Sequence, residues 1–379
     1  MVKIAITGTH STGKTTLAKS ISEQFKIPYI RGDKSIQICN SLFPNVPINK
    51  LSAYDAWKLQ RMMFESFNES LNHNGDCVTD GFHLSCLPYG LRYTDNKITQ
   101  MEGYNEFVQA VLDKSKEFDI IFYLPPEIAL ENNNFRPQDQ ALRMDIDTII
   151  FSLLQDFNYR TLSGTIESRT RQAGDELGIR DEQWSNYIVF EGLPRSGKST
   201  QIQSLKQKAE SRGIKLYLCE RNDNEFMTEF KRRRKTNWYD NSREMLKLHA
   251  EGIKYDFRIN NVEERLAEGQ MVVADRQKFT TMSLFGALGI PRYLLYEAVY
   301  DLPDPGKVIY LDTNPAISVM RSIQTESDRP LKVDLSLQEK VRALYLHYAR
   351  DHRFHVIKPN QSSQKVTQEI DAFVFGESR

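Results

Sequence analysis

Two glycine-rich loops constrain the fold of this chain more than any other feature. The first reads "GTHSTGKT" at 8–15 and the second reads "GLPRSGKS" at 192–199. Both fit the pattern G-x-x-x-x-G-K-[ST], and each lies between a short apolar segment and an amphipathic one. Because an apolar strand, such a loop and a helix form the start of a β–α unit, the sequence predicts two such units along one chain.

The composition of these loops suits the binding of phosphate. Glycines let the backbone curl so that successive N–H groups face one cluster of oxygens, and the helix N-terminus adds partial positive charge. The lysine then reaches the β- and γ-phosphates, and the next hydroxyl ligates Mg²⁺. The sequence therefore predicts two sites for ATP and Mg²⁺, with Thr15 and Ser199 as metal ligands. The expected ATP-binding residues are Gly8, Ser11, Gly13, Lys14, Thr15, Thr16, Gly192, Gly197, Lys198, Ser199 and Thr200.

Strand and helix patterns alternate after each loop. In the first half we expect strands at 2–7, 76–81, 118–126 and 159–164, and helices at 14–25, 53–71, 145–154 and 166–171. In the second half we expect strands at 185–192, 214–220, 270–276, 306–312 and 354–359, and helices at 198–211, 242–266, 337–350 and 364–375. The alternation predicts an α/β fold with two P-loop NTPase domains in tandem, each a parallel sheet flanked by helices.

The boundary between the domains is expected in a polar connector at 170–186, which lacks a strand pattern. We expect an N-terminal P-loop domain over 1–178 and a second P-loop domain over 185–379. A length of 379 residues agrees with two domains.

Composition excludes several classes of protein. Lys and Arg number 50, as do Asp and Glu, so a global basic field for nucleic acid is absent. No apolar run approaches the roughly 18 residues of a spanning helix, and a strand at the N-terminus leaves no room for a signal peptide. The four cysteines form no Cys-x-x-Cys pair, so we expect reduced thiols. A cytoplasmic enzyme without a membrane partner is expected.

Arginines in the second half are candidates for binding a phosphorylated acceptor. Transfer to a phosphate requires the neutralisation of extra negative charge and the alignment of two phosphates, which calls for fixed guanidinium groups. Arg195 is favoured by its place in the loop, and Arg276 because it ends a buried strand beside Asp275. With Lys198, these three are the expected catalytic residues. Further substrate-binding candidates are Arg221, Arg258, Arg321 and Arg329.

Four segments of the second half resemble thymidylate kinases, over about 185–375. They read "YIVFEGLPRSGKSTQ", "VVADRQKFTTMSLFGALG", "PGKVIYLDTNPAISVMRS" and "KVRALYLHYARDHRFHVIKPNQSSQKVTQEI". The resemblance implies transfer from Mg-ATP to a pyrimidine deoxynucleoside monophosphate similar to dTMP. It also implies that Arg258 and Arg276 contact the acceptor phosphate, that Arg195 or a lid arginine spans the transferred group, and that a homodimer is possible.

Two departures leave the acceptor open. Pro194 stands where the family often carries an Asp that grips the sugar 3′-hydroxyl, and "CERNDNEF" around Arg221 replaces the family's Arg-Glu-Pro. The acceptor is then a modified nucleotide or a hydroxymethyl-pyrimidine within DNA, as in the hypermodified genome of a phage. The basic run at 231–235, followed by Trp238 and Tyr239, suits a DNA backbone, and a solvated helix face is its alternative.

The first half carries a different set of candidates. Asp80 ends an apolar strand near the loop, where a carboxylate can accept the proton of an attacking hydroxyl; a turn-forming Asp before Gly81 is the alternative. Arg136 lies between Asn and Pro and suits a lid that steadies the γ-phosphate. Lys14, Asp80 and Arg136 are the expected catalytic residues of this half.

The first half, over about 1–173, resembles the nicotinamide-riboside-kinase-like group of P-loop kinases. The segments that carry this resemblance are "ITGTHSTGKTTLAKSI", "VTDGFHLSCLPYG", "FDIIFYLPPE", "NNNFRPQD" and "YRTLSGTIESR", the last with Arg169. The resemblance implies phosphorylation of a nucleoside or nucleotide. Two successive phosphorylations would explain the tandem arrangement, and a non-catalytic scaffold role for one half is the alternative.

Overall fold

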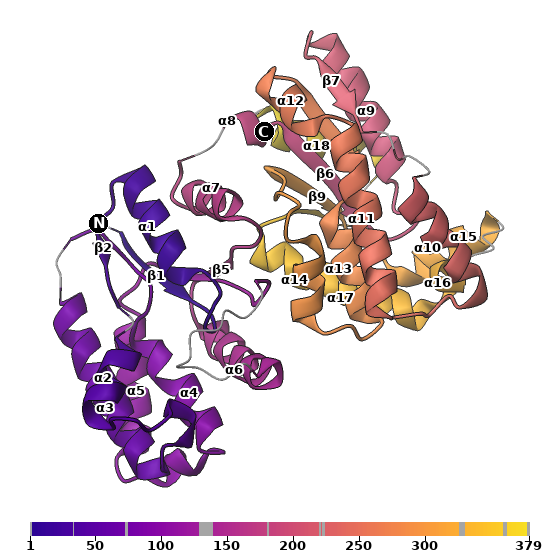
Figure 1. Ribbon diagram of the computed structural model, residues 1–379. Coiled ribbons are helices and arrows are strands. Elements are labelled where there is room, and N and C mark those ends of the chain that lie inside the picture. Colours follow the sequence, from indigo (N-terminus) through magenta and orange to yellow (C-terminus); the bar gives the residue numbers. More distant parts are fainter. Residues whose placement is uncertain are drawn as a thin grey trace. The chain divides into compact units, whose positions relative to one another are not determined.

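The computed structural model describes residues 2–32, 34–72, 75–128, 139–179, 182–219, 221, 224–325, 330–358 and 362–376. The chain divides into two compact units, an N-terminal unit over Met1–Ile179 and a C-terminal unit over Arg180–Arg379. Figure 1 shows that each unit has its own sheet with helices around it.

The N-terminal unit contains a five-stranded sheet in the order β2-β3-β1-β4-β5. All of its pairings are parallel, which confirms the predicted fold class. The strand that leads into the first loop lies at the centre of this sheet. The strands are β1 (Lys3–Thr7), β2 (Tyr29–Ile30), β3 (Cys77–Thr79), β4 (Ile120–Tyr123) and β5 (Tyr159–Thr161).

Helices cover both faces of this sheet. Successive side chains of β1 point to opposite faces and are buried on each of them. Ile4 and Ile6 pack with α1 (Lys14–Phe25) and α7 (Ile166–Glu176). Ala5 faces the larger core on the other side. The elements of that side, which Figure 1 draws in purple and magenta, are α2 (Ser35–Leu42), η1 (Ile48–Lys50), α3 (Ala53–Leu71), η2 (His83–Cys86), α4 (Leu87–Tyr93), η3 (Lys97–Gln100), α5 (Tyr104–Ser115), α6 (Gln140–Leu153) and η4 (Leu154–Asp156).

The C-terminal unit repeats the same topology with a parallel sheet in the order β10-β9-β6-β8-β7. The strand before the second loop is again central, and the strand that ends in Asp275 pairs beside it. The carboxyl ends of the central strands therefore form equivalent crevices in the two units. The strands are β6 (Tyr187–Gly192), β7 (Leu216–Leu218), β8 (Met271–Asp275), β9 (Lys307–Leu311) and β10 (His355–Ile357).

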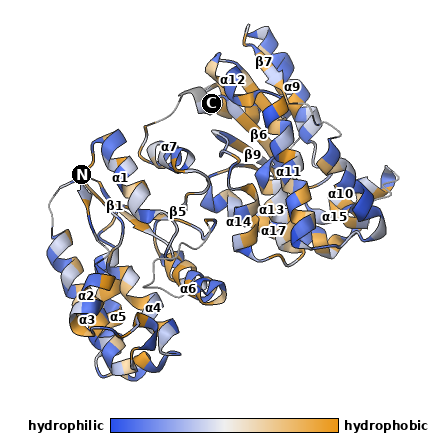
Figure 2. Cartoon of the chain, in the orientation of Figure 1, coloured by the Kyte–Doolittle hydropathy of each residue, from blue (hydrophilic) through white to orange (hydrophobic). Residues whose placement is uncertain are grey.

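One face of this second sheet packs on α9 (Lys198–Ser211) and α18 (Ser363–Phe375) through Ile188 and Phe190. Figure 2 shows hydrophobic residues gathered on β6 and β9 and hydrophilic residues along α10. The remaining helices are α8 (Glu182–Ser185), α10 (Glu225–Thr236), α11 (Arg243–Ile259), α12 (Val262–Ala267), α13 (Lys278–Ala287), α14 (Arg292–Val299), α15 (Pro315–Gln324), α16 (Pro330–Val333) and α17 (Leu335–Asp351).

One predicted helix is wrong in its continuity. The segment expected as a single helix over 242–266 forms α11 and α12, separated at Asn260 and Asn261. Asn261 adopts a left-handed backbone with φ of +48°. Asparagine tolerates this conformation, which ends an α-helix, so the apolar periodicity continues through a break in the backbone.

The cysteines and the helices agree with the expectations from composition. All four cysteines carry free thiols. Over the parts of the chain that the structure describes, every helix is too short or too polar to cross a membrane. The cytoplasmic location stays a prediction.

The start of β9 generates a prediction about stability. A Cβ added at Gly306 would lie 2.0 Å from the backbone carbonyl oxygen of Trp184, just before β6. Because neither backbone can move away cheaply, Gly306→Ala should lower the free energy of unfolding of the C-terminal unit by more than about 2 kcal/mol. Amide hydrogen exchange should accelerate in β6 and β9 and stay unchanged in β1 and β4.

Gly269→Asn is the matched control for this substitution. Gly269 has a left-handed φ of +74° and no atom within 4 Å of an added Cβ, and asparagine tolerates that backbone. If the amides of β6 and β9 exchanged equally slowly in the Gly306→Ala variant and in the control, the predicted clash would be contradicted.

Candidate active sites in the two units

The two glycine-rich loops share one backbone conformation. Three positions in each loop have left-handed φ, and one of the three is not glycine in either loop. The matched pairs are Gly8 and Gly192 (+143° and +148°), Ser11 and Arg195 (+55° and +58°), and Gly13 and Gly197 (+87° and +99°). Such a curl turns successive N–H groups toward one anion.

The first glycine of each loop is required by a close approach to a neighbouring strand. A Cβ at Gly8 would lie 2.5 Å from the carbonyl oxygen of Leu124, which follows β4, and a Cβ at Gly192 would lie 2.8 Å from that of Leu311 in β9. A side chain at either position would push the loop away from the sheet. The loops are therefore held at the carboxyl ends of the strands.

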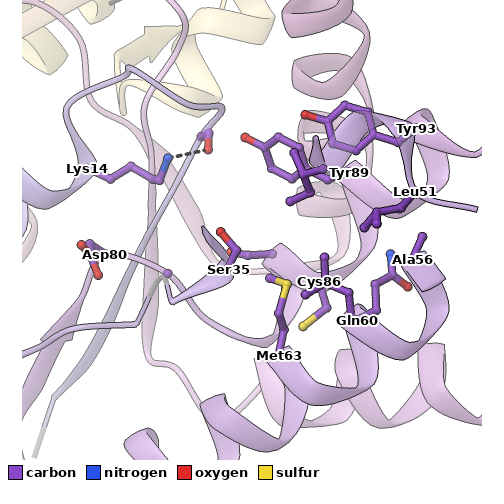
Figure 3. A pocket seen from close by; sticks show the side chains of 16 residues that line it. Lys14, Ser35, Leu51, Ala56, Gln60, Met63, Asp80, Cys86, Tyr89 and Tyr93 are labelled. Carbon is purple, nitrogen blue, oxygen red and sulfur yellow. Dashed lines mark hydrogen bonds between the residues drawn. The ribbon is translucent and has the colours of Figure 1, made fainter. Parts of the chain in front are cut away.

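The loop lysines lie over the curl. Lys14 Nζ donates to the carbonyls of Gly8 at 3.1 Å and Thr9 at 2.7 Å, and Figure 3 shows this side chain turned back over the loop. Lys198 Nζ donates to the carbonyls of Gly192 at 3.1 Å and Leu193 at 3.0 Å. Burial, together with the positive charge of Arg276, holds the pKa of Lys198 well below its usual range. A polyphosphate would offer each ammonium stronger, charged acceptors.

These residues fit Mg-ATP. Thr15 and Ser199 are both exposed at the first turn of the helix that follows each loop, beside the lysines. Their hydroxyls would hold Mg²⁺, which would neutralise charge on the phosphates. The exposed Thr16 and Thr200 follow directly, as expected for residues near the α-phosphate.

Asp80 lies beside the first loop, and hydrogen bonds from neighbouring residues hold its carboxylate. Its Oδ2 accepts from the hydroxyls of Thr15 at 2.6 Å and Tyr29 at 2.9 Å, and its Oδ1 accepts from the backbone N–H of Gly32 at 2.9 Å. Asp80 is buried. The carboxylate thus contacts the expected magnesium ligand. Tyr29, in the neighbouring strand β2, and Gly32, just after that strand, also hold the carboxylate and were not predicted from the sequence.

Two buried arginines hold the first loop through hydrogen bonds to its backbone carbonyls. Arg169 donates to the carbonyl of Thr12 at 2.6 Å and to Glu127 Oε1 at 2.6 Å. Arg143 donates to the carbonyl of Ser11 at 3.1 Å and to Thr9 Oγ1 at 3.2 Å. Burial lowers the pKa of Arg143.

Arg143 was not predicted from the sequence, because the helix was expected to begin at residue 145. The helix begins at Gln140, where the side chain of Asp139 accepts from the N–H of Leu142 at 3.1 Å. An Asp directly ahead of an apolar helix is an N-cap signal that could have extended the prediction to include Arg143.

The second loop is braced by helix α15 instead. Ser318 Oγ donates to the carbonyl of Pro194 at 2.6 Å, and Arg321 donates to the carbonyl of Arg195 at 3.0 Å. Arg195 and Arg321 are both exposed beside the loop. The structure therefore brings these two candidates together at the mouth of the phosphate site.

A buried network connects the second loop to Arg276. Glu191, which is 0% exposed, accepts from Thr280 Oγ1 at 2.6 Å, from the hydroxyl of Tyr345 at 2.9 Å and from the N–H of Gln277 at 2.9 Å. Arg276 donates to the hydroxyls of Thr280 and Tyr345, both at 3.3 Å. Burial raises the pKa of Glu191, and the charge of Arg276 opposes this shift.

Sequence analysis missed both Glu191 and Tyr345. A charged residue inside an otherwise apolar strand is the signal that could have identified Glu191, since such a group needs buried partners. Tyr345 lies in α17 among apolar residues, and its hydroxyl carries no signal in the sequence.

The C-terminal crevice gathers charges of both signs. Arg221 follows β7 and Asp275 ends β8, next to Arg276. Arg221 is open to solvent on one side, yet the surrounding protein and the positive charge of Arg276 lower its pKa. Asp275 Oδ1 is buried and, within the described residues, accepts no hydrogen bond. This oxygen is therefore available to a metal ion or a donor on a ligand.

Arg258 lies away from the second loop, whereas the resemblance implied that it contacts the acceptor phosphate. Its neighbour Phe257 packs on Tyr187 with ring centroids 6.0 Å apart, and Tyr187 is the first residue of β6 whereas Gly192 is the last. Five residues of strand separate these ends by about 17 Å. Arg258 is exposed, and this placement argues against its contact with an acceptor at the loop.

Arg136 and Arg329 lie outside the described residues. Apart from Arg258, the described candidates of each half lie at the carboxyl edge of their own sheet.

The basic run over 231–235 is not one solvated cationic face. Arg232 and Arg233 both pair with Glu229 at 2.6 Å. Arg234 is buried between the rings of Phe230 and Phe285, each 5.2 Å from its guanidinium carbon, and burial lowers its pKa to about 10. Both interpretations of this run were therefore incomplete, because Arg234, the fourth of its five residues, is part of the core.

Cavities lined by described residues open at both loops. A wide one of about 530 Å³ lies beside Asp80 and is lined by Thr15, Lys19, Tyr29, Arg31, Lys34 and Gln37. A narrow one of about 60 Å³ runs from Lys14 and Asp80 into the helices of the N-terminal unit (Figure 3). In the C-terminal unit a cavity of about 240 Å³ is lined by Gly197, Thr200, Asp312, Arg321 and Lys358, among others.

The two units are similar to different families of known proteins. The profile of the family described as thymidylate kinase matches residues 190–370, and the profile described as an AAA domain matches residues 3–169. The first result agrees with the resemblance inferred from the sequence. The second identifies a P-loop domain without stating its activity.

Relatives named thymidylate kinase align with the C-terminal unit. The enzyme of Francisella philomiragia is 30% identical over 201 residues, which are 50% of this chain and 98% of that protein. The enzyme of Vibrio parahaemolyticus is 29% identical over 199 residues (49% and 93%), and that of Dictyostelium discoideum is 26% identical over 192 residues (49% and 83%). The chain therefore belongs, through its C-terminal unit, to the thymidylate kinase family, and carries a P-loop domain of the AAA type in tandem.

Proposed function

We propose that the C-terminal unit transfers the γ-phosphoryl group of Mg-ATP to a pyrimidine deoxynucleoside monophosphate such as dTMP. An oxygen of the acceptor phosphate forms a bond to the γ-phosphorus, the bond to the β–γ bridging oxygen breaks, and ADP leaves. The observation that carries the proposal is the buried network that fixes Arg276 beside Lys198 in a thymidylate kinase fold.

The residues of this crevice suit that transfer. Lys198 would balance the β- and γ-phosphates, and Ser199 would ligate Mg²⁺, which supplies charge neutralisation when bound. Arg276 and Arg221 would hold the acceptor phosphate, and Asp275 would orient the metal or its waters. Arg195 and Arg321, exposed at the loop, would contact the transferred group.

For the N-terminal unit we propose transfer to a hydroxyl of a nucleoside or nucleotide. Asp80 would accept the proton of that hydroxyl as its oxygen attacks the γ-phosphorus, and Lys14 would balance the phosphates. The 2.6 Å contact between Asp80 and Thr15 supports this role, because it sets the carboxylate beside the expected metal ligand.

A second candidate is a kinase of hydroxymethyl-pyrimidines in DNA, of use in the hypermodification of a phage genome. Two observations favour it. Pro194 offers no side-chain acceptor for a free 3′-hydroxyl, and its carbonyl is already bonded to Ser318. The cavity beside Asp80 is lined by Lys19, Arg31 and Lys34, which suit phosphates next to an acceptor. Label from ATP that enters hydroxymethylated duplex DNA, and not free nucleotides, would establish this candidate over the first.

Substitution of each loop lysine separately tests whether both units are active. Lys198→Ala should lower dTMP phosphorylation by about 10²–10³-fold and leave nucleoside phosphorylation unchanged, because it removes one preorganised charge from one site. Lys14→Ala should have the converse effect. Transfer of label from ATP to each acceptor, resolved by chromatography, provides the measurement. If one variant abolished both activities or neither, one unit would be a non-catalytic scaffold.

Removal of one hydroxyl tests the positioning of Arg276. Tyr345→Phe should raise the KM for dTMP by about tenfold and leave the KM for ATP unchanged, because Arg276 loses a hydrogen bond that fixes it. Steady-state kinetics with each substrate varied would measure both values. Tyr348→Phe, at a buried tyrosine on the same helix, is the matched control. A rise in both KM values together would show a structural effect instead.

A further inference from the structure

The narrow cavity of the N-terminal unit is built to receive a flat, mostly apolar group. Figure 3 shows Lys14 and Asp80 at one end, Tyr89 and Tyr93 along one side, and Met63, Cys86 and Gln60 along the other. Leu51 and Ala56 close the far end. A ligand whose hydroxyl lies at Asp80 would therefore extend its apolar part between aromatic rings and the helix α3.

Gln60 is a buried polar group in this apolar part whose amide is incompletely hydrogen-bonded. It is 3% exposed, and its Nε2 donates to the carbonyl of Leu87 at 3.5 Å. Its Oε1 is buried and finds no hydrogen-bond partner in the described part of the chain. Because a carbonyl can only accept, Leu87 sets the orientation of the amide, and Oε1 is left without a donor.

Gly90 makes room for this amide. A Cβ at Gly90 would lie 1.6 Å from Gln60 Nε2 and 2.5 Å from Gln60 Cδ. The helix α4 thus lacks a side chain at the one place where the carboxamide lies. A buried amide with an unmet acceptor costs folding free energy, which a ligand that donates to it recovers.

We propose that this cavity binds the base of the acceptor nucleoside and that Gln60 Oε1 accepts a hydrogen bond from a ring N–H of a pyrimidine. The inference rests on the proposed kinase activity of the N-terminal unit and extends it to a substrate class. The apolar part of this cavity is small, so we expect a single ring there in preference to a fused double ring. Uracil and thymine present one ring N–H between two carbonyls, which matches an acceptor flanked by an amide N–H.

Methylation of that ring nitrogen provides the test. In the full-length Lys198→Ala protein, transfer of label from ATP to thymidine should exceed transfer to N3-methylthymidine by at least about tenfold in kcat/KM, since the methyl group removes the donor. The Gln60→Leu variant should raise the KM for thymidine by at least about tenfold and accept the two nucleosides equally. Gly90→Ala should have the same effect by displacing the amide. Gln109→Leu, at an exposed glutamine of the same unit, is the control.

Equal use of thymidine and N3-methylthymidine by the unsubstituted cavity would overturn the inference. So would a preference for purine nucleosides, or for nicotinamide riboside, whose ring nitrogen carries no hydrogen.

Binding distinguishes a failure of this inference from a failure of the proposed function. Calorimetric titration of thymidine into full-length Asp80→Asn protein, with and without Gln60→Leu, measures recognition without turnover. A Gln60-dependent heat with no label transfer in the unsubstituted protein would keep the base site and refute the kinase activity of the N-terminal unit. Label transfer that is unaffected by Gln60→Leu would refute the base site and keep the kinase activity of the N-terminal unit.

Discussion

Both sites depend on a strained turn of backbone that is pressed against the carbonyl of a neighbouring strand. A non-glycine residue, Ser11 or Arg195, adopts left-handed φ in each loop, and such residues persist only where the surroundings hold them. The two units meet this requirement differently. Buried guanidinium groups of Arg143 and Arg169 hold the carbonyls of the first loop, whereas side chains of α15 hold those of the second. A common loop geometry is thus stabilised by unrelated contacts.

The C-terminal crevice concentrates positive charge before any substrate arrives. Lys198, Arg221 and Arg276 repel one another, which contributes to the lowered pKa of Lys198 and of Arg221. The buried carboxylate of Glu191 and the hydroxyls around it keep Arg276 in place against this repulsion. Phosphate groups would relieve the repulsion, so part of the folding free energy is stored as electrostatic preorganisation for an anionic ligand.

The parts of the fold that the sequence predicts are those with local signals. The loops, the order of the strands and the positions of Asp80 and Asp275 follow from short motifs and from the apolar strands beside them. Arg143, Glu191 and Tyr345 escape prediction because the partners named above are between 69 and 154 residues away in the chain, so that only the folded sheet brings them together. Arg258 shows the opposite error, since a resemblance assigned a role that the position of α11 relative to β6 does not support.

The bond from the Thr15 hydroxyl to Asp80 has a consequence for the metal site. Because that hydroxyl donates its proton to the carboxylate, its lone pairs are turned outward, so the oxygen is oriented as a ligand in advance. In the described residues of the C-terminal unit, Ser199 makes no equivalent bond to Asp275, and its hydroxyl rotor must be ordered when the cation arrives. If Mg²⁺ binds at both loops, the hydroxyl of Thr15 then needs less reordering than that of Ser199.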